Sequence, residues 1–318
     1  MDRRKFLRHS SALAAIGILP ISSLKAFMPD MDKVGIQLFS IPKMLNEDFV
    51  GALTMLSELG YSEIELFGPY SFSAQSAKDQ WAAIGQMLGF TESGLFGLEG
   101  SEVKSIMNDL GLTTPSVHTD LDTLETKMEE LAAAAELLGY TYVCLPAIPD
   151  PLRQTMDDYR RMAERFNKIG ENALSHGLKF AYHNHGYGLQ EVDGIVPLQL
   201  IFDETDADKV FFEMDIFWTA GGKADPVEYL RNYPGRYKLM HIKDMREAVT
   251  FSGDGSTSDQ WFALFPYMTS AGEGVMDLES IVAVGKETGV DHFLVEQDLV
   301  QNPETALKKS IDYLGALE

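Results

Sequence analysis

The chain has 318 residues, 45% of them hydrophobic, and a formal net charge of −22 at pH 7. A surface this acidic repels phosphate backbones and anionic lipid headgroups, so we expect no nucleic-acid partner and no membrane-surface partner. The single cysteine, Cys144, excludes an intramolecular disulfide and lies in an apolar stretch that predicts a core position. A chain of this length can bury a large core without a disulfide.

Residues 1–30 have the layout of an export signal. Arg3 and Arg4 belong to a positively charged start, and a short apolar stretch covers residues 11–24. This order is typical of export signals, and the adjacent arginines resemble the twin-arginine type. We therefore expect a periplasmic protein with one folded unit over residues 31–318, which meets a membrane only if the signal stays uncleaved. A basic amphipathic N-terminal helix is the alternative.

Strand-like and helical segments alternate along the rest of the chain. Short apolar stretches predict strands over residues 33–40, 63–68, 113–119, 142–148, 178–185, 210–218, 237–244 and 292–298. Amphipathic stretches predict helices over residues 48–60, 101–111, 122–139, 155–176, 195–204, 225–232, 277–288 and 303–316. Alternating strands and helices imply parallel strands covered by helices, and eight such units predict a single-domain (β/α)8 TIM barrel. A doubly wound sheet is the alternative, but no glycine-rich phosphate loop follows a strand.

Two segments are longer than a barrel needs. Residues 69–100 follow the second predicted strand, and residues 246–272 follow the seventh. A loop that follows a barrel strand lies on the catalytic face. The second segment contains the Gly/Ser/Asp-rich stretch FSGDGSTSD at 251–259. Both a lid over the site and a disordered loop fit this composition.

Ionisable side chains gather where five of the predicted strands end. Catalytic groups of such barrels lie at the carboxyl ends of the strands. Side chains alternate along a strand, so residues two apart share one face. Ionisable groups inside a barrel are costly unless they pair or bind a cation. We therefore predict one shared site that is formed by His118, His183, His185, Asp215, His241, Lys243, Glu296 and Asp298.

The expected ligands of one divalent metal ion are His183, Asp215, His241 and Glu296. Mixed nitrogen and oxygen ligands suit Mn²⁺, Co²⁺, Zn²⁺ or Fe²⁺ better than Ca²⁺, and Mg²⁺ is kept as a further candidate. Glu213 lies one step deeper on the strand of Asp215. We expect it to be a buried, paired carboxylate that supports the ligands.

Each candidate also has a purely structural interpretation. Asp215 could cap the segment that follows it, and His118 could simply hydrogen-bond at a strand end. Lys243 and Asp244 could form a surface ion pair. Trp218 could offer a face on which a sugar stacks, or it could pack in the core. The sequence leaves these alternatives open.

Several stretches together resemble a known family. They are GIQLFS, PSVHTD, YHNH, MDIFWTAGGKADPVEYLRNYPGRYKLMHIKDM, AGEGVMDLESIV and FLVEQD. From about Asp32 onward the chain is similar to the xylose isomerase-like TIM barrels known as sugar phosphate isomerases/epimerases. The resemblance implies one divalent metal held by a Glu–Asp–His–Glu set from strands five to eight. Asp215, His241 and Glu296 match the last three positions, and His183 stands where the family has its first glutamate.

The resemblance, read with this departure, predicts the chemistry. The family's epimerases use two metal-bound glutamates as opposed proton-transfer groups, and one of these is absent here. We predict a metal-dependent isomerase or epimerase of an unphosphorylated sugar or keto-sugar that acts through an enediolate. Glu296 would be the base, and His183 or His185 the opposing group. The expected substrate contacts are His118, His185, Lys243, Arg246 and Trp218.

Other functions remain open at this point. A metal-dependent lyase, dehydratase or hydrolase could act on a keto-sugar or glycoside with the same residues. A non-catalytic sugar-binding protein is the alternative of another class. A barrel endonuclease of the DNA-repair type would need a larger His/Glu cluster and a basic groove, and the sequence indicates neither. Copies of the chain could also associate into a homo-oligomer, as barrels of this kind often do.

Overall fold

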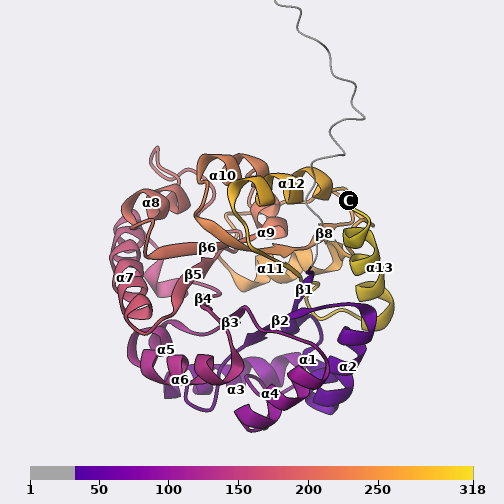
Figure 1. The fold of residues 1–318 in the computed structure, drawn as a ribbon. Helices are drawn as coiled ribbons and strands as arrows, with labels where there is room; N and C mark the ends of the chain where they lie inside the picture. The colour runs from indigo at the N-terminus through magenta and orange to yellow at the C-terminus, as the bar shows by residue number, and fades with distance from the viewer. Residues whose placement is uncertain (1–32, 318) are drawn as a thin grey trace, which may run out of the picture.

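Eight parallel strands close into a barrel in the computed structural model, which describes residues 33–317. Each barrel strand pairs with the next in chain order, and the last pairs with the first, so the ring has no free edge. Figure 1 shows the helices around the outside of this ring. The predicted single-domain (β/α)8 barrel is confirmed. Its strands are β1 (Gly35–Gln37), β2 (Glu63–Phe67), β3 (Ser116–His118), β4 (Tyr142–Leu145), β5 (Lys179–His183), β6 (Val210–Asp215), β7 (Tyr237–Ile242) and β10 (His292–Val295).

Helices follow or connect the strands, and their ends match local sequence signals. Thr155 and Asp158 form a capping box at the start of α7 (Met156–Ser175). Glycines in the left-handed conformation follow α2 (Phe49–Leu59), α6 (Met128–Leu138) and α12 (Leu278–Thr288). The α-helices are α1 (Pro42–Glu47), α2 (Phe49–Leu59), α3 (Gln75–Leu88), α4 (Gly100–Asp109), α5 (Leu121–Thr126), α6 (Met128–Leu138), α7 (Met156–Ser175), α8 (Pro197–Glu204), α9 (Ile216–Gly221), α10 (Pro226–Asn232), α11 (Ser258–Leu264), α12 (Leu278–Thr288) and α13 (Pro303–Gly315). Short 3-10 turns are η3 (Leu38–Ser40), η4 (Asp150–Leu152) and η5 (Phe265–Tyr267).

Every barrel strand ends one to three residues earlier than predicted, and one predicted helix is broken in two; three of these differences have a clear local reason. The first strand stops at Gln37, whose side chain accepts the Phe39 N–H and starts η3. The sixth strand stops at Asp215, whose side chain accepts the Trp218 N–H and starts α9. The predicted helix 122–139 breaks at Lys127 into α5 and α6, because Lys127 leaves the helical conformation. Side chains that bond nearby backbone groups compete with regular structure in this way.

The barrel interior changes from apolar to ionisable along the strands. A buried apolar layer is formed by Tyr142, Cys144, Ala181, Leu239 and Leu294, which confirms the core position of Cys144. Two residues further along, on the same faces, stand His183 in β5, His241 in β7 and Glu296 just after β10. The apolar layer therefore forms a floor beneath the ionisable groups.

The two long segments are both structured. Residues 69–100 contain α3, and residues 246–272 contain α11 and η5. The short strands β8 (Asp244–Met245) and β9 (Met268–Thr269) pair antiparallel at the base of the second segment. Phe251 is 2% exposed, and the Trp261 ring lies 4.6 Å from that of His185. The second segment is thus an ordered cover packed on His185, so the disordered-loop alternative is wrong, and the lid over the site stays a prediction.

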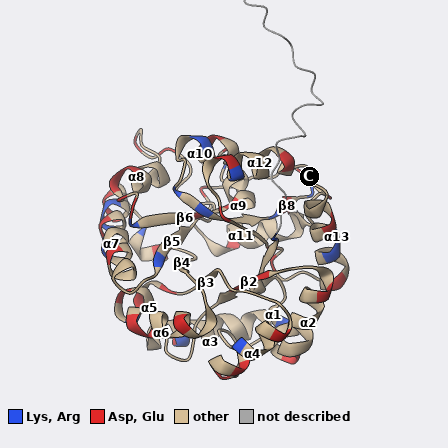
Figure 2. Ribbon diagram, viewed as in Figure 1, with Lys and Arg blue, Asp and Glu red and all other residues tan. Residues whose placement is uncertain are grey.

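Acidic residues are distributed over the outer helices with lysine and arginine interspersed, as Figure 2 shows. Within residues 33–317, no helix combines the length and the apolar character needed to cross a membrane. The predicted twin-arginine export signal falls on residues 1–30, which lie outside the described residues.

Candidate functional site

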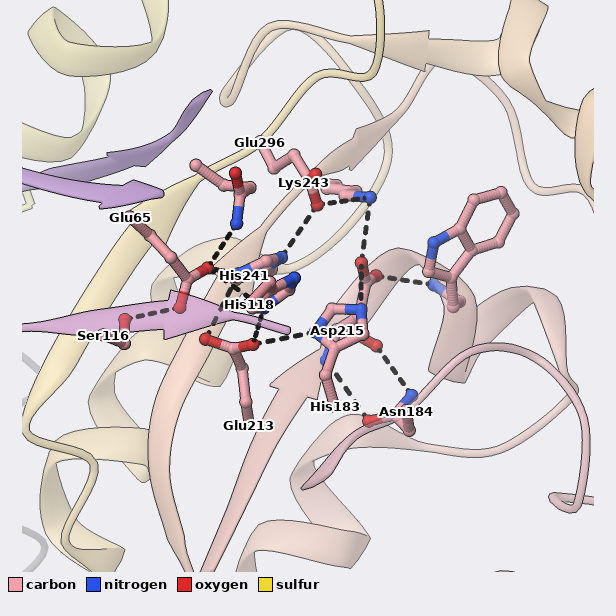
Figure 3. Close-up of polar contacts among 12 residues, drawn as sticks. Glu65, Ser116, His118, His183, Asn184, Glu213, Asp215, His241, Lys243 and Glu296 are labelled. Atoms are coloured by element: carbon pink, nitrogen blue, oxygen red, sulfur yellow. Dashed lines mark hydrogen bonds and ion pairs between the residues drawn. The ribbon is translucent and has the colours of Figure 1, made fainter. Parts of the chain in front are cut away.

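Asp215, His241 and Glu296 meet at the carboxyl ends of β6, β7 and β10 (Figure 3). All three are buried, and one ligand atom from each lies within 4.8 Å of the others. His241 Nδ1 is 2.8 Å from Glu296 Oε2. A divalent ion that bonds such atoms at about 2.0–2.2 Å would hold them at most about 4 Å apart, so the three side chains need only a small adjustment to share one. The structure therefore brings three predicted ligands together.

Asp215 combines two interactions that the sequence presented as alternatives. Its Oδ1 accepts the Trp218 N–H at 2.9 Å and caps α9. Its Oδ2 is buried and accepts no hydrogen bond from the described part of the chain, although Lys243 Nζ lies 3.0 Å away. Burial without a hydrogen bond is costly for a carboxylate oxygen, and a bound cation would satisfy it. The set of two carboxylates and an imidazole fits a divalent ion with nitrogen and oxygen ligands.

Asn184 fixes the position of Asp215. Its side-chain oxygen accepts the Asp215 N–H at 3.2 Å, and its amide nitrogen lies 3.4 Å from the Asp215 carbonyl oxygen and 3.1 Å from Thr219 Oγ1. The end of β5 is thereby tied to the end of β6. His183 Nε2 consequently lies 3.8 Å from Asp215 Oδ2, next to the predicted site.

A network of imidazoles and carboxylates lies in the barrel interior beside these residues (Figure 3). Glu213 Oε2 is 2.6 Å from His118 Nε2 and 3.0 Å from His183 Nδ1. Glu65 Oε2 is 2.7 Å from His241 Nε2 and 3.2 Å from His118 Nε2. All five residues are buried. Glu213 is the buried, paired carboxylate that the sequence predicts, and the His/Glu cluster is larger than the sequence indicates because it includes Glu65.

This network decides which imidazoles carry a proton. Burial disfavours the charged form of His241, but the carboxylates of Glu213, Glu296 and Glu65 raise its pKa well above the usual value. Burial and the charge of His241 lower the pKa of His183. Glu65 engages Nε2 of His241, so Nδ1 is the nitrogen on the side of Glu296, 2.8 Å from its Oε2. Glu213 engages Nδ1 of His183, which leaves Nε2. Carboxylates that orient imidazoles in this way strengthen metal sites.

Lys243 is a buried cation rather than a surface residue. Its Nζ lies 3.0 Å from Asp215 Oδ2, 2.7 Å from Glu296 Oε2 and 2.7 Å from Asp298 Oδ2. Burial opposes its charge, but these carboxylates raise the pKa of Lys243 well above the usual value. The alternative of a surface pair with Asp244 is wrong. The Asp244 carboxylate instead accepts backbone N–H groups of residues 245, 272, 274 and 276.

We expect the Lys243→Met variant to bind divalent metal roughly tenfold or more tightly, because its ammonium contacts two oxygens that the metal would use. The metal-free variant will lose about 3–5 kcal/mol of unfolding free energy, since buried carboxylates lose their counter-charge. Calorimetric titration with Mn²⁺ and thermal unfolding measure both effects. Lys127→Met, at a half-exposed surface pair, is the control. Unchanged metal affinity would mean that Lys243 and the metal do not compete.

His185 lies just after β5 and lines a cavity at the barrel mouth. Its imidazole hydrogen-bonds the backbone of Pro146, and it is the donor because proline has no N–H. Nδ1 is buried and has no hydrogen-bond partner among residues 33–317. Burial, with the charges of His183 and Lys243, lowers the pKa of His185 well below the usual value. A neutral imidazole with an unpartnered nitrogen is suited to accept a proton.

The cavity has a volume of about 400 Å³. Three of the expected substrate contacts, His118, His185 and Lys243, line it together with His183 and Glu296. Burial opposes protonation of His118, but Glu65 and Glu213 raise its pKa above the usual value. The polar lining residues lie at the part of the cavity over the ends of β3, β5, β7 and β10.

Trp218 and Arg246 correct the prediction, because neither lines this cavity. Trp218 is 2% exposed and stacks on Phe251 with ring centroids 5.7 Å apart. The core-packing interpretation of Trp218 is therefore right, and the sugar-stacking one is wrong. Arg246 is exposed and lines a separate depression with Gln297 and Val300. The chain turns at β8, which pairs with β9, and this turn directs Arg246 away from the barrel mouth.

Glu65 is the site residue that the sequence prediction missed. The stretch EIELF forms buried strand β2, and its alternation places Glu63 and Glu65 on one face. That repeated glutamate was the available signal. Gln37 Nε2 donates to Glu65 Oε2 at 2.7 Å, and Ser116 Oγ donates to its Oε1. Polar residues on β1 and β3 therefore hold Glu65 in place.

Comparisons with known proteins agree with this geometry. The family model described as xylose isomerase-like TIM barrel matches residues 53–317. A solved structure of a sugar phosphate isomerase/epimerase from Parabacteroides distasonis superposes with a TM-score of 0.68 and 25% identity. That superposition covers 91% of this chain and 98% of the other.

Two curated relatives match over shorter stretches. An inosose dehydratase of Lacticaseibacillus casei is 29% identical over 174 residues, which cover 51% of this chain and 55% of the relative. An inosose dehydratase of Clostridium botulinum strain Alaska E43 is 31% identical over 159 residues, which cover 48% of this chain and 52% of the relative. The chain thus spans about half the length of the curated relatives that it matches.

Proposed function

Because the chain belongs to the xylose isomerase-like TIM barrel family, we propose that it is a metal-dependent lyase that removes water from an unphosphorylated keto-sugar or keto-polyol. The observation that carries this proposal is the unsymmetrical set of groups at the cavity: the imidazole of His185, whose Nδ1 has no hydrogen-bond partner within residues 33–317, and the ammonium of Lys243. The inosose dehydratases among the relatives support it.

Asp215, His241 and Glu296 would hold one divalent cation, with His183 Nε2 as the fourth ligand in place of the family's glutamate. When bound, the cation would polarise the substrate carbonyl and acidify the neighbouring C–H bond. Mn²⁺, Co²⁺, Zn²⁺, Fe²⁺ and Mg²⁺ are the candidates that this ligand set suggests.

His185 would remove the proton from the carbon next to the carbonyl. The C–H electron pair becomes the new C=C bond, and the neighbouring C–O bond breaks. Lys243 is placed to donate a hydrogen bond to the departing hydroxyl, which leaves as water once it takes up the proton that His185 removed. One proton leaves carbon and one joins oxygen, so the net change is loss of one water. Glu296, which the sequence suggested as the base, already contacts Lys243 and His241.

An isomerase or epimerase is the second candidate. The Parabacteroides distasonis structure, which covers nearly the whole chain, carries the name sugar phosphate isomerase/epimerase. Epimerisation by two opposed carboxylates would need a glutamate where this chain has His183. A single imidazole base suits elimination, in which one face of the substrate loses its proton.

The deciding experiment incubates the metal-loaded protein with an inosose in deuterated water and follows the products by mass spectrometry. A product lighter by one water supports the lyase. Deuterium exchange into a product without loss of water identifies an isomerase or epimerase, and a product cleaved with uptake of water identifies a hydrolase. A ligand that binds without any exchange identifies a sugar-binding protein. Cell fractionation tests the accompanying proposal that the chain is exported to the periplasm.

A further inference from the structure

Apolar side chains line the cavity on the side of β1, β2 and α3. Phe39 follows β1, Phe67 ends β2, and Trp81 and Ile84 come from α3. The ring centroids of Phe39 and Phe67 are 5.4 Å apart, and those of Phe67 and Trp81 are 5.6 Å apart. These four residues form the apolar wall of the cavity. The imidazoles and the buried ammonium lie over other strands, so the cavity is amphipathic.

Helix α3 offers few partners for sugar hydroxyls. Residues 69–84 contribute Pro69, Ala77, Gln80, Trp81 and Ile84 to the lining, and Gln80 is the polar member. The Trp81 Nε1–H is already donated to the Thr91 carbonyl at 3.1 Å, which leaves the ring face apolar. Ile84 is 43% exposed within the described residues 33–317, which is costly for a large aliphatic side chain. A second sugar unit placed here would leave most of its hydroxyls without partners.

We propose that the substrate is a keto-sugar joined to a flat apolar group, such as an aryl aglycone, and that this group lies against the apolar wall. This inference rests on the proposed function, which places the reacting carbonyl at the polar side. The cavity of about 400 Å³ falls within the roughly 300–1,000 Å³ of pockets that enclose drug-sized ligands, so it has room beyond one sugar ring. Contact with Trp81 and Phe67 would hold an aromatic group by burial and ring stacking.

Calorimetric titration of the full chain compares phenyl β-D-glucopyranoside with methyl β-D-glucopyranoside and cellobiose. We expect the phenyl glycoside to bind roughly 10–100-fold more tightly than the methyl glycoside, which corresponds to burial of one aromatic ring. Trp81→Ala will remove most of this preference and leave the methyl glycoside affinity unchanged. Ile84→Glu, at a partly exposed position, tests the same wall without deleting a large ring. Met87→Ala, 65% exposed on the same helix and outside the lining, is the matched control.

The outcomes separate this inference from the proposed function. Equal affinity for the phenyl and methyl glycosides, with an inosose still dehydrated, overturns the inference alone. Tighter binding of cellobiose assigns the wall to a second sugar and also overturns it. A phenyl preference that survives in both Trp81→Ala and Ile84→Glu places the aryl group elsewhere. If no glycoside binds and no inosose reacts, both proposals fail.

Discussion

Replacing Asp215 with asparagine will lower the affinity for divalent metal by more than about a hundredfold, and turnover of an inosose will fall with it. Loss of an outer partner of a metal ligand alone typically costs about 10–100-fold, and Asp215 would be a ligand itself. The asparagine oxygen can still accept the Trp218 N–H that caps α9. The variant therefore keeps the helix start and loses the charged oxygen that lacks a hydrogen bond within residues 33–317. Elemental analysis and titration with Mn²⁺ measure the effect.

Asp215→Ala provides the structural comparison for this result. It removes both the charge and the cap, so its unfolding free energy will fall by about a further 1 kcal/mol relative to the asparagine variant. Both variants should lose metal equally if the charged oxygen is the ligand. Full metal occupancy in either variant would remove Asp215 from the site and leave the acidic cluster without its proposed purpose.

Replacing His185 with alanine will reduce kcat by about 10²–10⁴-fold while metal content stays unchanged. His185 contacts the cavity but is not one of the proposed ligands, so the loss reports proton transfer rather than metal binding. Single-turnover measurements on the metal-loaded variant test this. His176→Ala, at an exposed position at the end of α7, is the control and should keep full activity. A His185→Ala variant with normal kcat would exclude the imidazole as base.

The pH dependence of the unchanged protein follows from the same residue. The base acts only when unprotonated, and burial lowers the pKa of His185 well below the ordinary value of 6.5. The imidazole therefore stays unprotonated as the pH falls through that value. The acid limb of kcat/KM attributable to His185 should consequently lie well below pH 6.5. An acid limb at the ordinary histidine pKa would indicate that His185 is solvated or that another group is the base.

Much of this site could be predicted because its residues stand where strands end. Strand boundaries and side-chain alternation are local properties, and they placed Asp215, His241 and Glu296 on one face of the barrel mouth. The contacts of Glu65 with His241 and of Lys243 with Asp298 depend on the register of strands whose residues lie 176 and 55 positions apart in the chain. A single sequence gives no measure of that register. The contacts of Glu65 and Lys243 were therefore recognised only in the structure of the closed barrel.

Arg246 shows the limit of extending a strand pattern past its end. HIKDMR reads as one continuing stretch, but Asp244 gathers backbone N–H groups from residues 272–276 and turns the chain. The prediction that Trp218 contacts the substrate failed for a related reason. The sixth strand ends at Asp215, and the Trp218 side chain packs against the cover formed by residues 246–272. In both cases one aspartate side chain redirects the backbone.

The cover formed by residues 246–272 has a consequence for exchanging parts between relatives. A Cβ on Gly186, the residue after His185, would overlap the ring of Phe251, and Gly255 lies against the Gly186 backbone. The loop that contains His185 and Gly186 thus packs closely against the cover, with no space for a larger side chain at Gly186. A chimaera in which residues 246–272 come from another barrel would displace the His185 imidazole, unless the loop that contains His185 and Gly186 is exchanged together with them.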